Sequence, residues 1–176
     1  DLMENVNIYH NIAVIPGDLN GITVTDATLA LSESLDGKLS KSIKHTRFPY
    51  NADYFLERGI KELGQDELDG LRKYDQIFLG AIGDPTKIKP GVLELGILLR
   101  IRQAFDQYVN LRPIILPVGV PSIIVGKTSE DFNFEICREN SEGLYVGVGW
   151  IRNKGTKDEV ACQIMECTYK GVKRLA

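Results

Sequence analysis

The order of apolar and amphipathic segments in the first half of the chain constrains the fold more than any other feature. Three apolar or alternating runs predict β-strands, and three segments with apolar residues at helical spacing predict α-helices. The strands are expected over 11–15, 41–48 and 76–82, and the helices over 24–35, 53–63 and 66–74. Strands that alternate with helices along a chain usually pair in parallel within one sheet. The sequence therefore predicts an α/β fold with a largely parallel sheet flanked by helices.

The second half of the chain predicts one long helix followed by strands. The helix is expected over 92–108, a buried strand over 109–117 and a short strand over 132–138. This last strand should deliver Arg138 at its carboxyl end, where open α/β sheets usually place ligands. Within 145–169, two strand-like segments flank the turn-rich sequence RNKGTKD. They predict a long β-hairpin with an apolar face.

Composition and charge argue against several classes of function. The chain has 176 residues, 26% charged side chains and a formal net charge of −3. No apolar run is long enough to span a bilayer, and no basic cluster alternates with aromatic residues as in proteins that bind single-stranded nucleic acid. We therefore expect neither a membrane nor a nucleic acid as a partner.

The cysteines and histidines show no pattern of metal ligands. Cys137, Cys162 and Cys167 are odd in number and lie among apolar neighbours, which predicts buried free thiols and a reducing cytoplasm. His10 and His45 have no ligand spacing. No metal-binding residue is therefore predicted in this chain.

Three arginines, Arg102, Arg112 and Arg138, suggest a receptor for a small molecule with two carboxylates. A guanidinium group matches a carboxylate with two parallel charge-assisted hydrogen bonds and stays charged at any working pH. Arg112 lies within the apolar run VNLRPIILP, where a buried charge requires a partner. Each arginine alone could instead solvate a surface or lie over apolar neighbours. The joint pattern of the three favours binding of an organic acid.

Motifs along nearly the whole chain occur in the order found in one enzyme family. NIAVIPGD, FPYNADYFLERG and YDQIFLGAIGDP are followed by GVLELGILLRIRQAFDQYVNLRP, RENSEGLYVGVG and KGTKDEVACQIMECTYKGVKRLA. With its three arginines, this series resembles the β-decarboxylating dehydrogenases, the family of isocitrate, 3-isopropylmalate, D-malate and tartrate dehydrogenases. The resemblance implies a parallel-rich mixed sheet, with 1–108 in a large α/β domain and 109–176 in a small domain. It also implies that the hairpin is an arm that clasps a second subunit in a homodimer, because an isolated apolar hairpin is marginally stable in water.

The same resemblance implies roles for individual residues. The three arginines would bind the substrate, and Tyr145 would be the catalytic acid that protonates the enolate after decarboxylation. Leu98 lies four residues before Arg102 on the predicted helix, so the two share a face. Leu98 could be a core residue, but the resemblance implies contact with an apolar or absent appendage of the substrate. Glu94 is implied as a contact of the cofactor.

The resemblance implies NAD and either Mg²⁺ or Mn²⁺ as cofactors. The family's catalytic lysine, metal-binding aspartates and main adenosine-binding loop match nothing up to Ala176, so we expect this chain to be the front part of a longer enzyme and inactive alone. One departure from the family pattern is Leu19 in the loop GDLNG, where relatives usually carry a glycine. A glycine there lets the backbone approach the cofactor closely.

The predicted function is NAD-dependent oxidative decarboxylation of a 2-hydroxy dicarboxylic acid. Leu98 favours 3-isopropylmalate, an acid of leucine biosynthesis, as the substrate. The motif RENSEGLY is instead shared with D-malate and tartrate dehydrogenases, and the tryptophan at position 150 is similar to that of the isocitrate enzymes. A hypothesis of another class is a non-catalytic subunit that binds a dicarboxylate through its arginines and dimerises with an active partner.

Overall fold

The computed structural model describes residues 8–35 and 41–176. The chain divides into two compact units, Asp1–Ile101 and Arg102–Ala176, and each is described by itself. The predicted domain boundary between 108 and 109 stays a prediction. No helix within the described ranges is long and apolar enough to cross a membrane.

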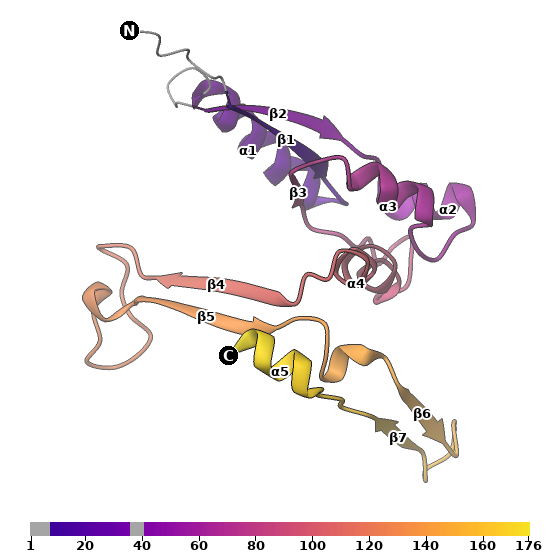
Figure 1. The fold of residues 1–176 in the computed structure, drawn as a ribbon. Helices are drawn as coiled ribbons and strands as arrows, with labels where there is room; N and C mark the ends of the chain where they lie inside the picture. The colour runs from indigo at the N-terminus through magenta and orange to yellow at the C-terminus, as the bar shows by residue number, and fades with distance from the viewer. Residues whose placement is uncertain (1–7, 36–40) are drawn as a thin grey trace, which may run out of the picture. The chain divides into compact units, whose positions relative to one another are not determined.

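The first unit is built on a three-stranded parallel sheet (Figure 1). Its strands are β1 (Ile8–Ile15), β2 (Lys41–Arg47) and β3 (Gln76–Leu79), in the order β2-β1-β3. Ile12 of the central strand pairs with both His45 and Gln76. The last three residues of β1 are fully buried, because a central parallel strand is covered on both faces. The predicted α/β class and parallel pairing are confirmed.

Three helices connect these strands, namely α1 (Asn20–Leu35), α2 (Ala52–Arg58) and α3 (Gln65–Leu71). The side chain of Asn51 caps α2 by accepting a hydrogen bond from the Tyr54 backbone N–H at 2.9 Å. Gly59 ends α2 in the left-handed conformation, with φ of 63°, so the helix stops before the predicted residue 63. Phe55, Leu68 and other apolar residues of these helices are buried in the core.

The predicted helix over 92–108 is shorter in the structure and starts with an unusual segment. Glu94–Leu99 form the π-helix η1, and α4 follows over Arg100–Ala104. The Gly96 carbonyl accepts a hydrogen bond from the Leu63 backbone N–H at 3.0 Å, while the Arg100 N–H bonds to the Ile97 carbonyl. The Gly96 carbonyl is thus drawn out of the helical ladder where the π-helix meets α4.

The second unit contains two antiparallel pairs of strands and a helix. β4 (Val109–Ile115) pairs with β5 (Asn133–Glu139), and β6 (Gly149–Arg152) pairs with β7 (Val160–Gln163). Single 3₁₀ turns, η2 (Ser129–Asp131) and η3 (Leu144–Val146), precede β5 and β6. The helix α5 (Tyr169–Leu175) is capped by Thr168. The predicted hairpin is confirmed, although its strands are shorter than the segments that predicted it.

Two sequence predictions for this unit are wrong. The strand around Arg112 is exposed along most of its length, not buried. Cys137 and Cys167 are exposed and Cys162 is partly exposed, although all three are free thiols. Arg138 does lie at the carboxyl end of its strand, as predicted, but this strand belongs to a separate antiparallel pair, to which the rule for open parallel sheets does not apply. The common reason is that a two-stranded ribbon lacks the second layer that covers a parallel sheet.

Candidate functional site

At the carboxyl edge of the parallel sheet, one carboxylate joins the loops that follow all three strands. Asp18 lies just after β1 and is 6% exposed. Its Oδ1 accepts a hydrogen bond from the Ala52 backbone N–H and its Oδ2 accepts one from the Gly83 N–H, both at 2.9 Å. The Asp18 backbone N–H donates to the Ala81 carbonyl at 2.8 Å. This edge is where open α/β sheets usually bind ligands, and Asp18 holds its loops in place.

The loop around Asp18 packs too closely on the end of β3 for side chains at its glycines. A Cβ atom on Gly17 would lie 2.1 Å from the Ala81 carbonyl oxygen, and one on Gly21 would lie 2.3 Å from the same atom. Leu19, between them, adopts a positive φ of 47° and is exposed. This conformation favours glycine, so a leucine at this point of the loop has an unfavourable backbone geometry.

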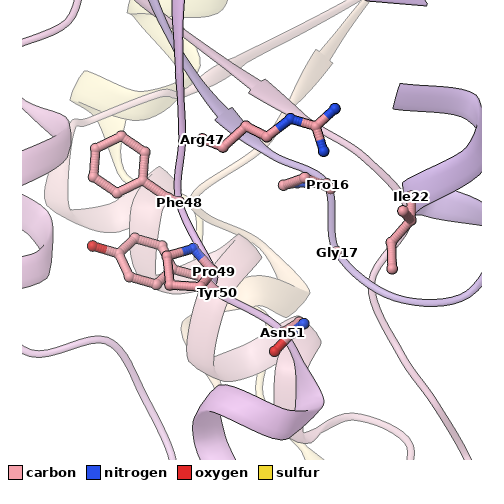
Figure 2. Close-up of a pocket in the computed structure, with 8 residues that line it drawn as sticks. All are labelled: Pro16, Gly17, Ile22, Arg47, Phe48, Pro49, Tyr50 and Asn51. Atoms are coloured by element: carbon pink, nitrogen blue, oxygen red, sulfur yellow. The ribbon is translucent and has the colours of Figure 1, made fainter. Parts of the chain in front are cut away.

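A pocket of about 290 Å³ opens between the loops that follow β1 and β2 (Figure 2). Residues 16–17 and Ile22 line one side, and residues 47–51 line the other. In Figure 2 the Arg47 side chain extends toward the side of Ile22, whereas the rings of Phe48 and Tyr50 point the opposite way. Arg47 also pairs with Asp26. Sequence reasoning did not identify this pocket, although both strand ends were predicted.

The strand order predicts where the connecting helices lie. The chain moves from β1 to β2 in one direction and from β2 to β3 in the other. Because such crossovers are right-handed, the helices after β1 and β2 are expected on opposite faces of the sheet.

Glu94 and Leu98 both lie in the π-helix η1 and are partly buried. The Glu94 Oε2 accepts a hydrogen bond from the Gly91 backbone N–H at 2.9 Å. Its Oε1 lies 3.9 Å from the point where a Cβ on Gly83 would stand. Glu94 is therefore close to the loop that Asp18 holds, at the carboxyl edge of the sheet. The roles of Glu94 and Leu98 stay predictions.

The other predicted site residues all lie in the second unit. β4 and β5 pair so that Asn110 is opposite Arg138 and Arg112 is opposite Ile136. Directly opposite residues of an antiparallel pair share a face, as do residues two apart on one strand. Arg112 and Arg138 therefore project from the same face of the ribbon.

Arg138 contacts Tyr145, which lies in the 3₁₀ turn η3. A terminal nitrogen of the Arg138 guanidinium donates a hydrogen bond to the Tyr145 hydroxyl. The guanidinium carbon also lies 5.3 Å from the centre of the Tyr145 ring, within the range of a cation–π contact. The predicted catalytic acid thus has a charged hydrogen-bond partner.

Arg102 completes this cluster. Burial lowers the pKa of the Arg102 guanidinium, Tyr145 opposes that shift, and the positive charges of Arg138 and Arg112 add to it. These couplings require the four groups to lie close together. Among the described residues, none of the three arginines pairs with a carboxylate. We call Arg102, Arg112, Arg138 and Tyr145 the arginine cluster.

Two asparagines that sequence reasoning missed support the arginine cluster. The Arg112 Nε donates to the Asn110 Oδ1 at 2.9 Å, and the Asn110 Nδ2 donates to the Asn140 Oδ1 at 3.2 Å. Asn140 is only 5% exposed. The available signals were the motifs NLRP and RENSEG, in which each asparagine lies two residues from an arginine.

A second network attaches the helix α5 to β5. Arg174 lies 2.9 Å from an Asp106 oxygen and 3.8 Å from Glu139, measured between side-chain nitrogen and oxygen atoms. Burial raises the pKa of Glu139, but hydrogen bonds from Ser141 and the backbone N–H groups of Asn140 to Glu142 outweigh it and lower the pKa to about 2. Glu139 is therefore an anion that the surrounding loop stabilises.

The arrangement of the arginine cluster suits an anion with more than one carboxylate. Three guanidinium groups that lack carboxylate partners within the described part of the chain repel one another, and a bound dianion offsets that repulsion. No group of three or more His, Cys, Asp or Glu residues that could hold a metal ion is present in residues 8–35 and 41–176.

Comparisons with known proteins agree with the motifs. Residues 11–176 match the family described as isocitrate/isopropylmalate dehydrogenase. A 3-isopropylmalate dehydrogenase of Bifidobacterium longum is 41% identical over 167 residues, which cover 94% of this chain and 47% of that protein. A tartrate dehydrogenase/decarboxylase of Pseudomonas putida is 35% identical over 165 residues, covering 93% and 45%. The chain thus spans about half the length of the curated relatives it matches.

The fold also matches solved structures. The crystal structure of isocitrate dehydrogenase from Methylococcus capsulatus superposes with a TM-score of 0.68 over 94% of this chain and 45% of that one, at 24% sequence identity. At this level of identity the similarity concerns the fold alone.

Proposed function

Because the chain belongs to the isocitrate/isopropylmalate dehydrogenase family, we propose that it is part of a decarboxylating dehydrogenase that acts on a 2-hydroxy dicarboxylic acid. The observation that carries the proposal is the arginine cluster, in which three guanidinium groups and a phenol lie together on one unit. Guanidinium groups that lack carboxylate partners among the described residues provide the charge that an acid with two carboxylates requires.

Each member of the cluster has a role in this proposal. Arg102, Arg112 and Arg138 bind the carboxylates of the acid and hold it in one orientation. Tyr145 supplies the proton that takes the place of the departing carboxylate, and its hydrogen bond from Arg138 fixes the position of its oxygen. NAD, when bound, would accept the hydride, and Mg²⁺ or Mn²⁺ would polarise the oxidised carbonyl.

Within the family we propose 3-isopropylmalate as the substrate. Leu98 is the residue that supports this choice, because a leucine favours an apolar appendage over the additional carboxylate of isocitrate. D-malate and tartrate remain the alternatives, because a tartrate dehydrogenase is among the relatives. This chain covers about the same fraction of that enzyme as it covers of the 3-isopropylmalate dehydrogenase.

The test is a substrate panel with the full-length protein that carries this chain. NAD reduction is measured with 3-isopropylmalate, D-malate, tartrate and isocitrate, and kcat/KM is expected to be highest for 3-isopropylmalate. Arg112→Gln should lower kcat/KM for the acid by about a hundredfold, with the KM for NAD unchanged. Arg58→Gln, in α2 and outside the cluster, is the matched control. Highest activity on another acid would overturn the substrate, and no NAD reduction with any acid would overturn the dehydrogenase.

Leu19 favours a second candidate function, a non-catalytic subunit that binds a dicarboxylate. Its positive φ places a strained leucine in the loop at the carboxyl edge of the sheet. A subunit of this kind would bind the acid but would not reduce NAD, and Leu19→Gly would not restore the reaction. Calorimetric titration with the same acids separates this candidate from a protein that binds no acid.

A further inference from the structure

Asn110 lies between two arginines of the cluster, and we propose that it positions Arg112 for the acid. This inference rests on the proposed binding of a dicarboxylate by the arginines. On the shared face of β4 and β5, Asn110 is directly opposite Arg138 and two residues before Arg112. The Nε–H of Arg112 donates to the Asn110 side-chain oxygen at 2.9 Å.

The orientation of the Asn110 amide is itself fixed by a buried neighbour. The Asn110 Nδ2 donates to the Asn140 Oδ1 at 3.2 Å, so the Asn110 oxygen points toward Arg112. Asn140 is held by two further bonds. Its Nδ2 donates to the Gln107 carbonyl at 3.1 Å, and its backbone N–H donates to the Tyr108 carbonyl at 2.9 Å. A chain of hydrogen bonds thus runs from the backbone before β4 to the guanidinium of Arg112.

This chain determines which edge of the guanidinium faces the acid. An arginine offers a carboxylate either its Nε and one terminal nitrogen or its two terminal nitrogens. Because Asn110 occupies the Nε–H, Arg112 binds the carboxylate end-on, through its two terminal nitrogens. Asn110 achieves this without a charge of its own, so the positive charge of Arg112 stays available.

Binding of the acid to the full-length protein tests this role. Asn110→Ala is expected to raise the Kd of the acid about tenfold, with the Kd of NAD unchanged. Asn110→Asp should weaken binding further, because its carboxylate competes with the acid for Arg112. In an Arg112→Lys background Asn110→Ala should have no further effect, since lysine lacks the Nε–H. An equal loss in both backgrounds, or unchanged binding by Asn110→Ala, would overturn the inference.

A measurement without ligand separates this inference from the proposed function. Exchange of the Arg112 Nε–H with solvent is followed by NMR in the wild-type protein and in Asn110→Ala. We expect exchange at least tenfold faster in the variant, whether or not the wild-type protein binds an acid. Equal exchange rates would refute the positioning role, whereas a wild-type protein that binds no dicarboxylate would refute the proposed function instead.

Discussion

At the residue scale, Asp18 shows how one side chain can organise a ligand-binding edge. Its two carboxylate oxygens accept backbone hydrogen bonds from the loops after β2 and β3, while its own backbone belongs to the loop after β1. The bonds are charge-assisted and largely withdrawn from water, so their loss is costly. The same side chain therefore links the stability of the unit to the geometry of its carboxyl edge.

We expect Asp18→Ala to lower the free energy of unfolding by about 3 kcal/mol, because two backbone donors lose a charged acceptor. Asp18→Asn is the matched control. It keeps one side-chain oxygen and should lose about half as much. Urea unfolding of the full-length protein, followed by circular dichroism, measures both values. A loss below about 1 kcal/mol for the alanine variant would contradict the importance of these bonds.

At the element scale, the first unit was more predictable than the second. The parallel strands were predicted because buried central strands have continuous apolar sequences, as residues 12–15 do. The π-helix was not predicted, because the Gly96 carbonyl within it accepts a hydrogen bond from Leu63, and a contact between segments distant in sequence leaves no local pattern. The exposure of β4 was also missed, since an apolar run does not reveal whether a second layer covers it.

The residues of the candidate site were also predicted only in part. Arg102, Arg112, Arg138 and Tyr145 were predicted, and the structure brings them together. Asn110 and Asn140 were not identified, because an asparagine beside an arginine is common and only the register of β4 and β5 aligns them. Residues that are close in sequence do not by themselves reveal a hydrogen-bond network that depends on how two strands pair.

The stability of the loop that follows β5 depends on pH through Glu139. Its folded pKa of about 2 lies below its ordinary value of 4.5, so its ionisation stabilises the folded state above the unfolded pKa. That contribution is lost as the pH falls from about 4.5 toward 2. We expect Glu139→Gln to lower the melting temperature at pH 7 and to make it less dependent on pH across that window. A pH dependence as steep as that of the wild-type protein would contradict the shift.

At the scale of the whole molecule, the hairpin β6–β7 carries the prediction of a homodimer. Trp150 and Ile151 on β6 are 52% and 51% exposed, and Val160 on β7 is 40% exposed. An isolated two-stranded hairpin is marginally stable in water, and burial of apolar side chains by a partner would stabilise it. A second copy of the same hairpin offers a matching apolar surface, because two-fold contacts bring one patch against itself.

We expect the substitution Trp150→Arg to shift the full-length protein from dimer to monomer, because it places a charge in an apolar contact. Sedimentation equilibrium across a range of protein concentrations measures the change, and the dissociation constant should rise at least a hundredfold. Lys154→Gln and Lys157→Gln, in the exposed turn of the hairpin, are controls that should leave the dimer intact. A wild-type protein that sediments as a monomer, or a charged variant that stays dimeric, would show that this hairpin does not join two subunits.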